Sequence, residues 1–357
     1  MVECLSFERG IMRLDIRNPD DDVLYVPFSS YGTVRGTFNF DGSMRRMGKN
    51  TLMVNSATSD WYTHPLDGMG ATTARESIDK LGAIVSETCK INGFKSVVYF
   101  GFSMGGYGAL LYSRSSEIDV PLRCVAIGTN TPVDLPRTIS SRHLASIDCD
   151  DSLGDLLVEG FDAEDRNYVI ACGELDVGDL YSAIVFHETY GDKILTISHA
   201  GSTHNVLSHL KELGGLEDSL SLMFTGDQQL LGWGRSAREI TSAEIKPLLT
   251  FSPNMNAAEE VSYLIELTEK YPFFAYGLSR IGSYFYEKGD KGKAKKYLCK
   301  AWELAPNYHT VNKLLSRLYE DLGDIKLSLS HAILVNRMFK NSENESRVGF
   351  LLSEMRP

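Results

Sequence analysis

The chain has 357 residues, 43% of them hydrophobic and 23% charged, an ordinary composition for a globular protein of two domains. Its formal net charge of −11 argues against a main role in binding nucleic acid. No apolar run approaches the roughly 20 residues of a membrane-spanning helix, and the charged N-terminal stretch lacks the apolar core of a signal peptide. We therefore expect a cytoplasmic protein without a membrane span.

The cysteines favour a reducing compartment and give no sign of a metal site. None of the six stands in C-x-x-C spacing, and several fall in expected strands or helices, where cysteine usually acts as a small buried hydrophobe. They are Cys4, Cys89, Cys124, Cys149, Cys172 and Cys299. Neither a metal nor a cofactor is expected.

The first part of the chain alternates short apolar strands with helices. Thr73–Glu76 has the form of a capping box, and the helix that it starts ends at Asn92-Gly93. Because neighbouring parallel strands need a crossover connection, this alternation predicts an α/β fold, a mainly parallel sheet flanked by helices. The expected strands are 12–16, 23–28, 51–55, 97–100, 123–127, 167–171 and 193–197.

The segment 96–112 carries the strongest chemical signal. It reads SVVYFGFSMGGYGALLY, a buried strand, then G-x-S-x-G at 101–105, then helix-compatible apolar residues. This is the setting of a nucleophile elbow, in which a serine occupies strained backbone geometry. Side chains at Gly101 or Gly105 would collide with neighbouring elements. The pattern predicts Ser103 as a nucleophile, against the alternative of an inert serine in a glycine-rich turn.

An acid and a histidine follow later strands, in the order that such a serine requires. A serine hydroxyl needs an imidazole to take its proton, and the imidazole needs a carboxylate to orient it. The strand at 167–171 leads to Asp176, our choice for the acid, and the strand at 193–197 leads to His204, our choice for the base. The alternatives are Glu174 and Asp179 for the acid, and His199 and His209 for the base.

An acyl transfer site also needs backbone N–H groups that hold the oxyanion. One is expected from Met104, the residue after the nucleophile. The other is expected from the loop after the 23–28 strand, at Phe28 or Ser29. That second assignment depends on position alone.

Residues 23–204 resemble an α/β-hydrolase domain through GFSMG at 101–105, GELD at 173–176 and GSTH at 201–204. They are most similar to bacterial hydrolase-like proteins of surface-glycan and capsule loci and accessory secretion. Those proteins share a strand ending in FS, a WY loop and a G[FS]S[MK]GG[YF] elbow, present here as Phe28-Ser29, Trp61-Tyr62 and Gly101–Tyr107. The HGGG motif of many esterases is absent. The resemblance implies an acylated carbohydrate as substrate, with Trp61 and Tyr62 as candidate substrate-binding residues.

A polar, acid-rich stretch at 130–166 separates two expected strands, where such folds carry a lid. Arg137 and Arg142 within it are candidates to meet an anionic group of a substrate. A solvated loop-and-helix insertion is the alternative interpretation.

The chain after residue 214 changes character. Residues 215–254 mix Gly-Gly, Gly-Trp-Gly and Ser-Pro with short apolar runs, which indicates a transition between a catalytic domain at 1–214 and a helical domain at 255–357. In the latter, Gly289-Asp290 recurs 34 residues later as Gly323-Asp324, a period that resembles the tetratricopeptide repeat. Flanking helices at 257–271 and 347–355 are expected as half-repeat caps. The lysines between 288 and 300 form a basic face, either solvated or a docking surface for an acidic protein partner.

Together these features predict a serine esterase or deacylase that works through an acyl-serine intermediate. An O-acyltransferase that modifies a glycan is a second possibility, with a sugar hydroxyl instead of water as the acceptor. A third is a non-catalytic interaction protein that binds through its repeats. The intact order of serine, acid and histidine argues against the third.

Overall fold

The computed structural model describes residues 11–56, 58–131, 140–141, 167–212, 214–227, 234–250 and 257–355. The chain divides into two compact units. The first comprises Met1–Gly173, Val177–His199 and His204–Leu249, and the second Glu174–Asp176, Ala200–Thr203 and Thr250–Pro357. Within the described ranges, no helix combines the length and the apolar character needed to cross a membrane.

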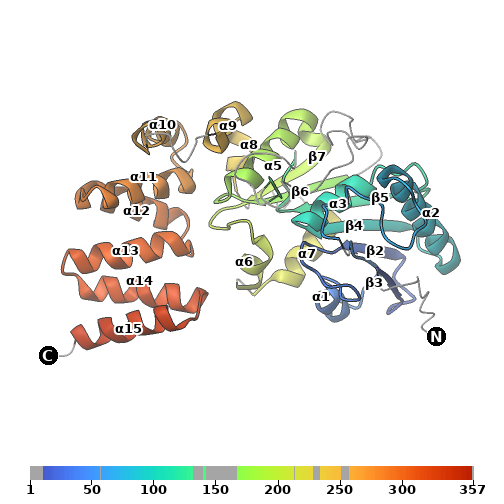
Figure 1. Cartoon of the computed structure of the whole chain (residues 1–357), viewed down its shortest axis with the longest axis horizontal. Coiled ribbons are helices and arrows are strands. Elements are labelled where there is room, and N and C mark those ends of the chain that lie inside the picture. Colours follow the sequence, from blue (N-terminus) through green and yellow to red (C-terminus); the bar gives the residue numbers. More distant parts are fainter. Residues whose placement is uncertain are drawn as a thin grey trace. The chain divides into compact units, whose positions relative to one another are not determined.

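The described part of the first unit contains a seven-stranded sheet in the order β1-β3-β2-β4-β5-β6-β7 (Figure 1). The edge strand β1 is antiparallel to β3, and all other neighbouring pairs are parallel. This is the expected α/β-hydrolase architecture, so the predicted fold class is confirmed. The strands are β1 (Met12–Asp15), β2 (Val23–Phe28), β3 (Asn50–Val54), β4 (Ser96–Phe102), β5 (Leu122–Ile127), β6 (Asn167–Gly173) and β7 (Ile194–His199).

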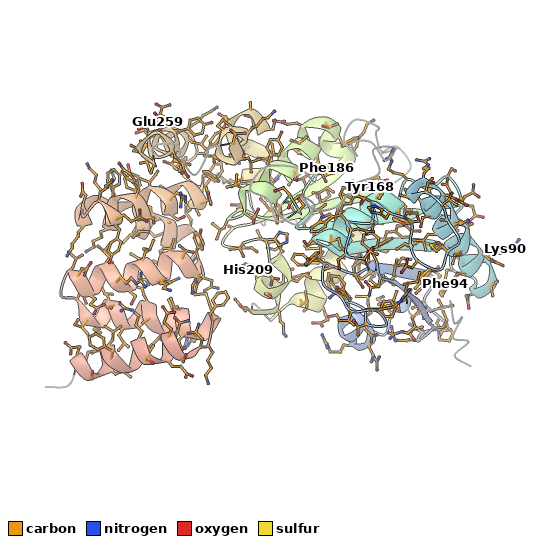
Figure 2. All side chains as sticks on the ribbon, in the orientation of Figure 1. Lys90, Phe94, Tyr168, Phe186, His209 and Glu259 are labelled. Atoms are coloured by element: carbon orange, nitrogen blue, oxygen red, sulfur yellow. The ribbon has the colours of Figure 1, made fainter. Side chains whose placement is uncertain are left out.

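Helices cover both faces of this sheet, because its strands are apolar on both sides. Along β4, Val98 and Phe100 point to the face covered by α1 (Asp41–Arg46), α6 (Val206–Glu212) and α7 (Leu216–Thr225). The other face carries α2 (Ala74–Asn92), α3 (Met104–Tyr112) and α5 (Val177–Tyr190). Tyr168 on β6 and Phe186 on α5, labelled in Figure 2, are 3% and 1% exposed.

The start and the end of α2 follow the sequence signals. The side chain of Thr73 accepts a hydrogen bond from the N–H of Glu76, which satisfies one of the donors left open at the helix start. Gly93 closes the helix with a φ of 78°, in the left-handed region that glycine adopts without a steric penalty.

The stretch expected as a transition, 215–254, contains three helices among its described residues. They are α7, α8 (Ser236–Glu239) and α9 (Ser242–Thr250). Leu220, Met223 and Phe224 of α7 belong to the core of the sheet domain. The first compact unit accordingly extends to Leu249, within the stretch expected as a transition.

The helical part of the second unit repeats its element bounds. The start of α13 follows the start of α11 by 34 residues, and α14 follows α12 by the same interval. Asp290 and Asp324 cap α12 and α14 by accepting the N–H groups of Lys293 and Leu327, at 3.0 Å each. The helices, stacked in Figure 1, are α10 (Ala257–Lys270), α11 (Ala275–Glu287), α12 (Lys291–Leu304), α13 (His309–Asp321), α14 (Ile325–Met338) and α15 (Ser342–Glu354).

Successive helices α11 and α12 pack closely against each other. A methyl group at Gly282 on α11 would lie 2.7 Å from the Cγ atom of Leu298 on α12, so a larger residue there would displace the leucine. Leu298 and Leu315 are buried in one apolar cluster that joins α11, α12 and α13. The helices α10 and α15 flank these pairs, and α15 begins at Ser342, before the flanking helix expected at 347–355.

Candidate active site

Ser103 occupies a sharp turn between β4 and α3. Its φ of 56° and ψ of −122° are strained for a residue with a side chain. The glycines two positions away are required by space. A methyl group at Gly101 would lie 2.2 Å from the carbonyl of Gly105, and one at Gly105 would lie 2.2 Å from the carbonyl oxygen of Phe28. The G-x-S-x-G segment therefore has the local geometry that the sequence predicts.

His204 faces the serine from the loop between β7 and α6. Its Nε2 atom lies 3.0 Å from Oγ of Ser103, within hydrogen-bond distance. The two residues are 101 positions apart in the chain, and both stand at the carboxyl edge of the sheet. Ser103 is 9% exposed and the His204 side chain 15%, so the pair is sheltered but reachable.

The carboxylate that holds His204 is Asp179, and not Asp176 as expected. Nδ1 of His204 lies 2.9 Å from Oδ2 and 3.1 Å from Oδ1 of Asp179, whose side chain is fully buried. The reason is where the elements end: β6 continues to Gly173 and α5 begins at Val177, so Glu174 and Asp176 lie in the short connection. Asp179 lies in the first turn of α5, which brings both of its carboxylate oxygens within hydrogen-bond distance of the imidazole.

Asn130 also belongs to the site, and sequence reasoning placed it only at the start of a lid. Its Nδ2 atom donates to Oδ1 of Asp179 at 2.7 Å, and its own Oδ1 accepts from Oγ of Ser140 at 3.2 Å. Asn130 is 5% exposed and follows β5, a neighbour of the elbow strand. The available signal was its place after a strand end, the same rule that located His204.

The oxyanion assignments need one correction. The N–H of Ser29 donates to the carbonyl of Val54 at 2.9 Å, so it does not face the nucleophile. Phe28 is paired with Val54 on one side and Gly101 on the other, inside the sheet. Met104 keeps the expected place, because it is the first residue of α3 and the first N–H groups of a helix have no acceptor within the helix.

The two aromatic residues expected to bind substrate are interior residues. Trp61 is 2% exposed and Tyr62 is fully buried, because Tyr62 packs against Phe28 and Tyr112 beneath the elbow helix. Neither side chain offers a surface to a ligand. Arg137 and Arg142 lie outside the described residues, as does the expected lid except for residues 130–131 and 140–141.

His199 and His209 do not contact the nucleophile in this arrangement. His199 ends β7 and is 6% exposed, and burial, together with the nearby His209, lowers its pKa to about 3. It is therefore neutral at physiological pH. His209, labelled in Figure 2, lies on α6 with its ring 6.0 Å from that of His199, and burial lowers its pKa as well.

Residues of the types that bind metals are present, and two of them, Asp179 and His204, are hydrogen-bonded to each other. Asp179 and His204 could each act as a metal ligand, yet the facing atoms of the two side chains are paired with each other. The cysteines within the described residues are Cys89, Cys124, Cys172 and Cys299. Three of them are buried, and burial raises the pKa of Cys89 to about 12, which makes it a poor ligand and nucleophile.

No protein-family model and no curated protein sequence matches the chain. Among solved structures it is similar to the Glycosylation Associate Protein (Gap123) complex from Streptococcus agalactiae, with a TM-score of 0.42 and 14% identity over 62% of this chain and 47% of that one. An esterase of Pyrococcus furiosus, Pf2001, aligns with a TM-score of 0.42 and 14% identity, over 62% of this chain and 87% of that one.

The capsule O-acetyltransferase of Neisseria meningitidis serogroup A aligns with a TM-score of 0.40 and 14% identity, over 60% of this chain and 90% of that one. The alignment with the streptococcal complex spans less than half of that chain. The fold assignment above rests on the strand order and on the elbow, which are properties of this structure itself.

Proposed function

We propose that the protein is a serine hydrolase that cleaves an ester through an acyl-serine intermediate. One observation carries the proposal: a continuous hydrogen-bonded relay runs from Oγ of Ser103 through the imidazole of His204 to the carboxylate of Asp179. Its members have the roles of nucleophile, general base and orienting acid.

The relay supports a two-step reaction. His204 takes the hydroxyl proton of Ser103 on Nε2 as Oγ bonds to the carbonyl carbon of the ester. The resulting oxyanion is held in part by the N–H of Met104, and its collapse breaks the ester C–O bond. The alcohol leaves with the proton from Nε2. Water then attacks the acyl-serine by the same route, which releases the acid and restores the serine.

The acceptor in the second step decides between hydrolysis and transfer. Water gives an esterase or deacylase, whereas a sugar hydroxyl in the same place gives an O-acyltransferase. We propose an acylated carbohydrate as the substrate class, and this finer assignment depends on the sequence resemblance to glycan-locus hydrolases. Hydrolysis is the favoured form, with acyl transfer as the alternative.

A fluorophosphonate probe tests the proposal directly, because it forms a covalent adduct only with an activated serine. We expect one label, mapped by peptide mass spectrometry to Ser103, and hydrolysis of p-nitrophenyl acetate by the unmodified protein. The variant Ser103→Ala should lose the label and several orders of magnitude in turnover while keeping its circular dichroism spectrum.

Two neighbouring aspartates provide a matched comparison for the acid. Asp179→Asn should lower kcat by about 10³–10⁴-fold, because an amide cannot hold the imidazole in the productive tautomer. Asp176→Asn makes the same chemical change at the acid expected from the sequence and should lose less turnover than Asp179→Asn. Equal losses in the two variants, or a loss in Asp176→Asn alone, would contradict the role of Asp179.

The same labelling experiment separates the remaining candidate, a non-catalytic interaction protein. Its support is the basic face of the repeats, where lysine ammonium groups lie over aromatic rings. Lys293 lies 4.8 Å from the ring centre of Phe285 and Lys295 lies 5.3 Å from that of Tyr319. An acidic protein partner fits this face. A folded protein without any fluorophosphonate label would favour binding as the sole function.

A further inference from the structure

The loop that follows β2 is fixed against the nucleophile elbow. The hydroxyl of Ser30 donates to the carbonyl of Phe102, the residue before Ser103, at 2.8 Å. The N–H of Ser30 donates to Oδ1 of Asn39 at 2.6 Å, so the loop is also held from the segment that precedes α1. These contacts make residues 29–32 one wall beside the nucleophile elbow.

A second segment holds this wall from behind. It consists of Ser56 and residues 58–63, and we call it the Asp60 turn. The hydroxyl of Tyr62 donates to the carbonyl of Ser29 at 2.9 Å, and the N–H of Gly32 donates to Oγ of Ser59 at 3.1 Å. The Asp60 turn thus contacts the loop at both of its ends.

The backbone of the Asp60 turn is strained. Ser59, Trp61 and Tyr62 have φ values of 54°, 56° and 59°, in the left-handed region that residues with a side chain rarely adopt. Such strain persists only where surrounding contacts over-determine it, and it concentrates at functional sites.

The carboxylate of Asp60 supplies those contacts. Asp60 is 4% exposed, and it accepts hydrogen bonds from Oγ of Ser56 at 2.9 Å, from Oγ1 of Thr58 at 2.6 Å and from the N–H of Tyr62 at 3.0 Å. A buried carboxylate with three donors fixes the turn, and through the N–H of Tyr62 it fixes the direction in which that side chain leaves the backbone.

Tyr62 has little freedom to move its hydroxyl elsewhere. The side chain is fully buried, and its ring lies so near the elbow helix that a methyl group at Gly108 would be 2.6 Å from it. Burial raises the pKa of Tyr62 well above its usual value, so the phenol remains a proton donor throughout the physiological range.

We propose that Tyr62 is a positioning residue for the reaction at Ser103: its hydroxyl holds the Ser29 carbonyl and thereby fixes the 29–32 loop beside the nucleophile. The proposal rests on the proposed hydrolase function. A loop that is already fixed does not have to rearrange as charge develops on the substrate. Fixing it therefore lowers the free energy of the transition state more than that of the bound substrate. Loosening it should lower kcat and leave KM nearly unchanged.

The test compares two tyrosines of one aromatic cluster. Tyr62→Phe removes only the hydroxyl that reaches Ser29. Tyr112→Phe is the matched control, since Tyr112 is also fully buried against Phe28 but donates its hydrogen bond to Oγ of Ser77, at 3.0 Å. Both variants keep their rings and lose one buried hydrogen bond, so their melting temperatures should fall by similar amounts.

The measurements are kcat and KM for p-nitrophenyl acetate and the rate of fluorophosphonate labelling at Ser103. We expect Tyr62→Phe to lower kcat and the labelling rate by about tenfold to a hundredfold, the range for a small misplacement near the reacting atoms. Tyr112→Phe should stay within about twofold of the unmodified protein, a change too small to matter on this scale.

Three other results would overturn the proposal. If the unmodified protein is labelled but Tyr62→Phe reacts as fast as Tyr112→Phe, the positioning role is wrong and the hydrolase function stands. A rise in KM at constant kcat would show that the loop affects substrate binding instead. If the unmodified, folded protein is not labelled, the proposed function and the positioning role both fail.

Discussion

Asp179 is held on two sides, by the imidazole of His204 and by the amide of Asn130. The amide donates to Oδ1 at 2.7 Å. Gly128, with a φ of 57°, also approaches the carboxylate: a methyl group there would lie 3.3 Å from Oδ2 of Asp179. A hydrogen bond to a charged group contributes about 1.5–3 kcal/mol, enough to change a rate tenfold or more if it acts in the transition state.

We therefore predict that Asn130→Ala lowers kcat by about tenfold with KM changed less than about twofold, since the amide orients the acid without facing the substrate. Steady-state kinetics on p-nitrophenyl acetate measures both values. Asn50→Ala is the control: Asn50 is fully buried in the same unit and its side chain bonds the backbone of Asn18 and Asp21. It should lower the melting temperature without lowering kcat, and equal kcat losses in both variants would refute the orienting role.

At the scale of elements, the turn between β4 and α3 can form only because Gly105 has no side chain. The backbone of β2 passes so close that a methyl group at Gly105 would lie 2.2 Å from the carbonyl oxygen of Phe28 and 3.1 Å from that of Ser29. Backbone cannot yield as a flexible side chain can, so a substitution here must displace either the strand or the helix.

Gly105→Ala should destabilise the protein by about 3 kcal/mol and abolish labelling of Ser103, because the clash moves the elbow. The comparison is Gly349→Ala within α15, where nothing lies within 4 Å of the added methyl group. That variant should stabilise its helix by about 0.5–1 kcal/mol, the usual gain of alanine over glycine in a helix. Urea denaturation followed by circular dichroism distinguishes the two, and a stable, labelled Gly105→Ala variant would contradict this account.

At the scale of the whole molecule, the sheet domain needs α7 to close its core. The ring of Phe224 on α7 packs at an angle against Tyr25 and edge-on against Phe100 of the sheet, with ring centres 5.2 Å and 4.7 Å away. Leu220 and Met223 beside it are fully buried. Burying three such side chains contributes about 5–9 kcal/mol, as much as the total stability of many domains.

A chain truncated after Gly214 should therefore fail to fold, whereas one truncated after Thr250 should keep a folded sheet domain and a reactive Ser103. Size-exclusion chromatography and fluorophosphonate labelling of the two truncated chains test this. A folded, labelled chain ending at Gly214 would show that the sheet domain does not need α7. Loss of labelling in both would mean that the sheet domain depends on the second unit.

The sequence by itself determined the features that arise from interactions between residues close together in the chain. The alternation of strands and helices predicts the parallel sheet, and the glycines around Ser103 predict the elbow, because both follow from backbone sterics within a few residues. The 34-residue period likewise appears in the helix bounds, since each Gly-Asp turn ends one helix and caps the next.

Only the tertiary structure decided which side chains meet. The sequence favoured Asp176 over Asp179, and the outcome depends on where β6 ends and α5 begins, a matter of one helical turn. Trp61 and Tyr62 read as a polar, aromatic loop, yet the strained Asp60 turn carries them inward to support the loop after β2. Contacts such as Asn130 to Asp179 join segments 49 residues apart, and no local pattern encodes their distance.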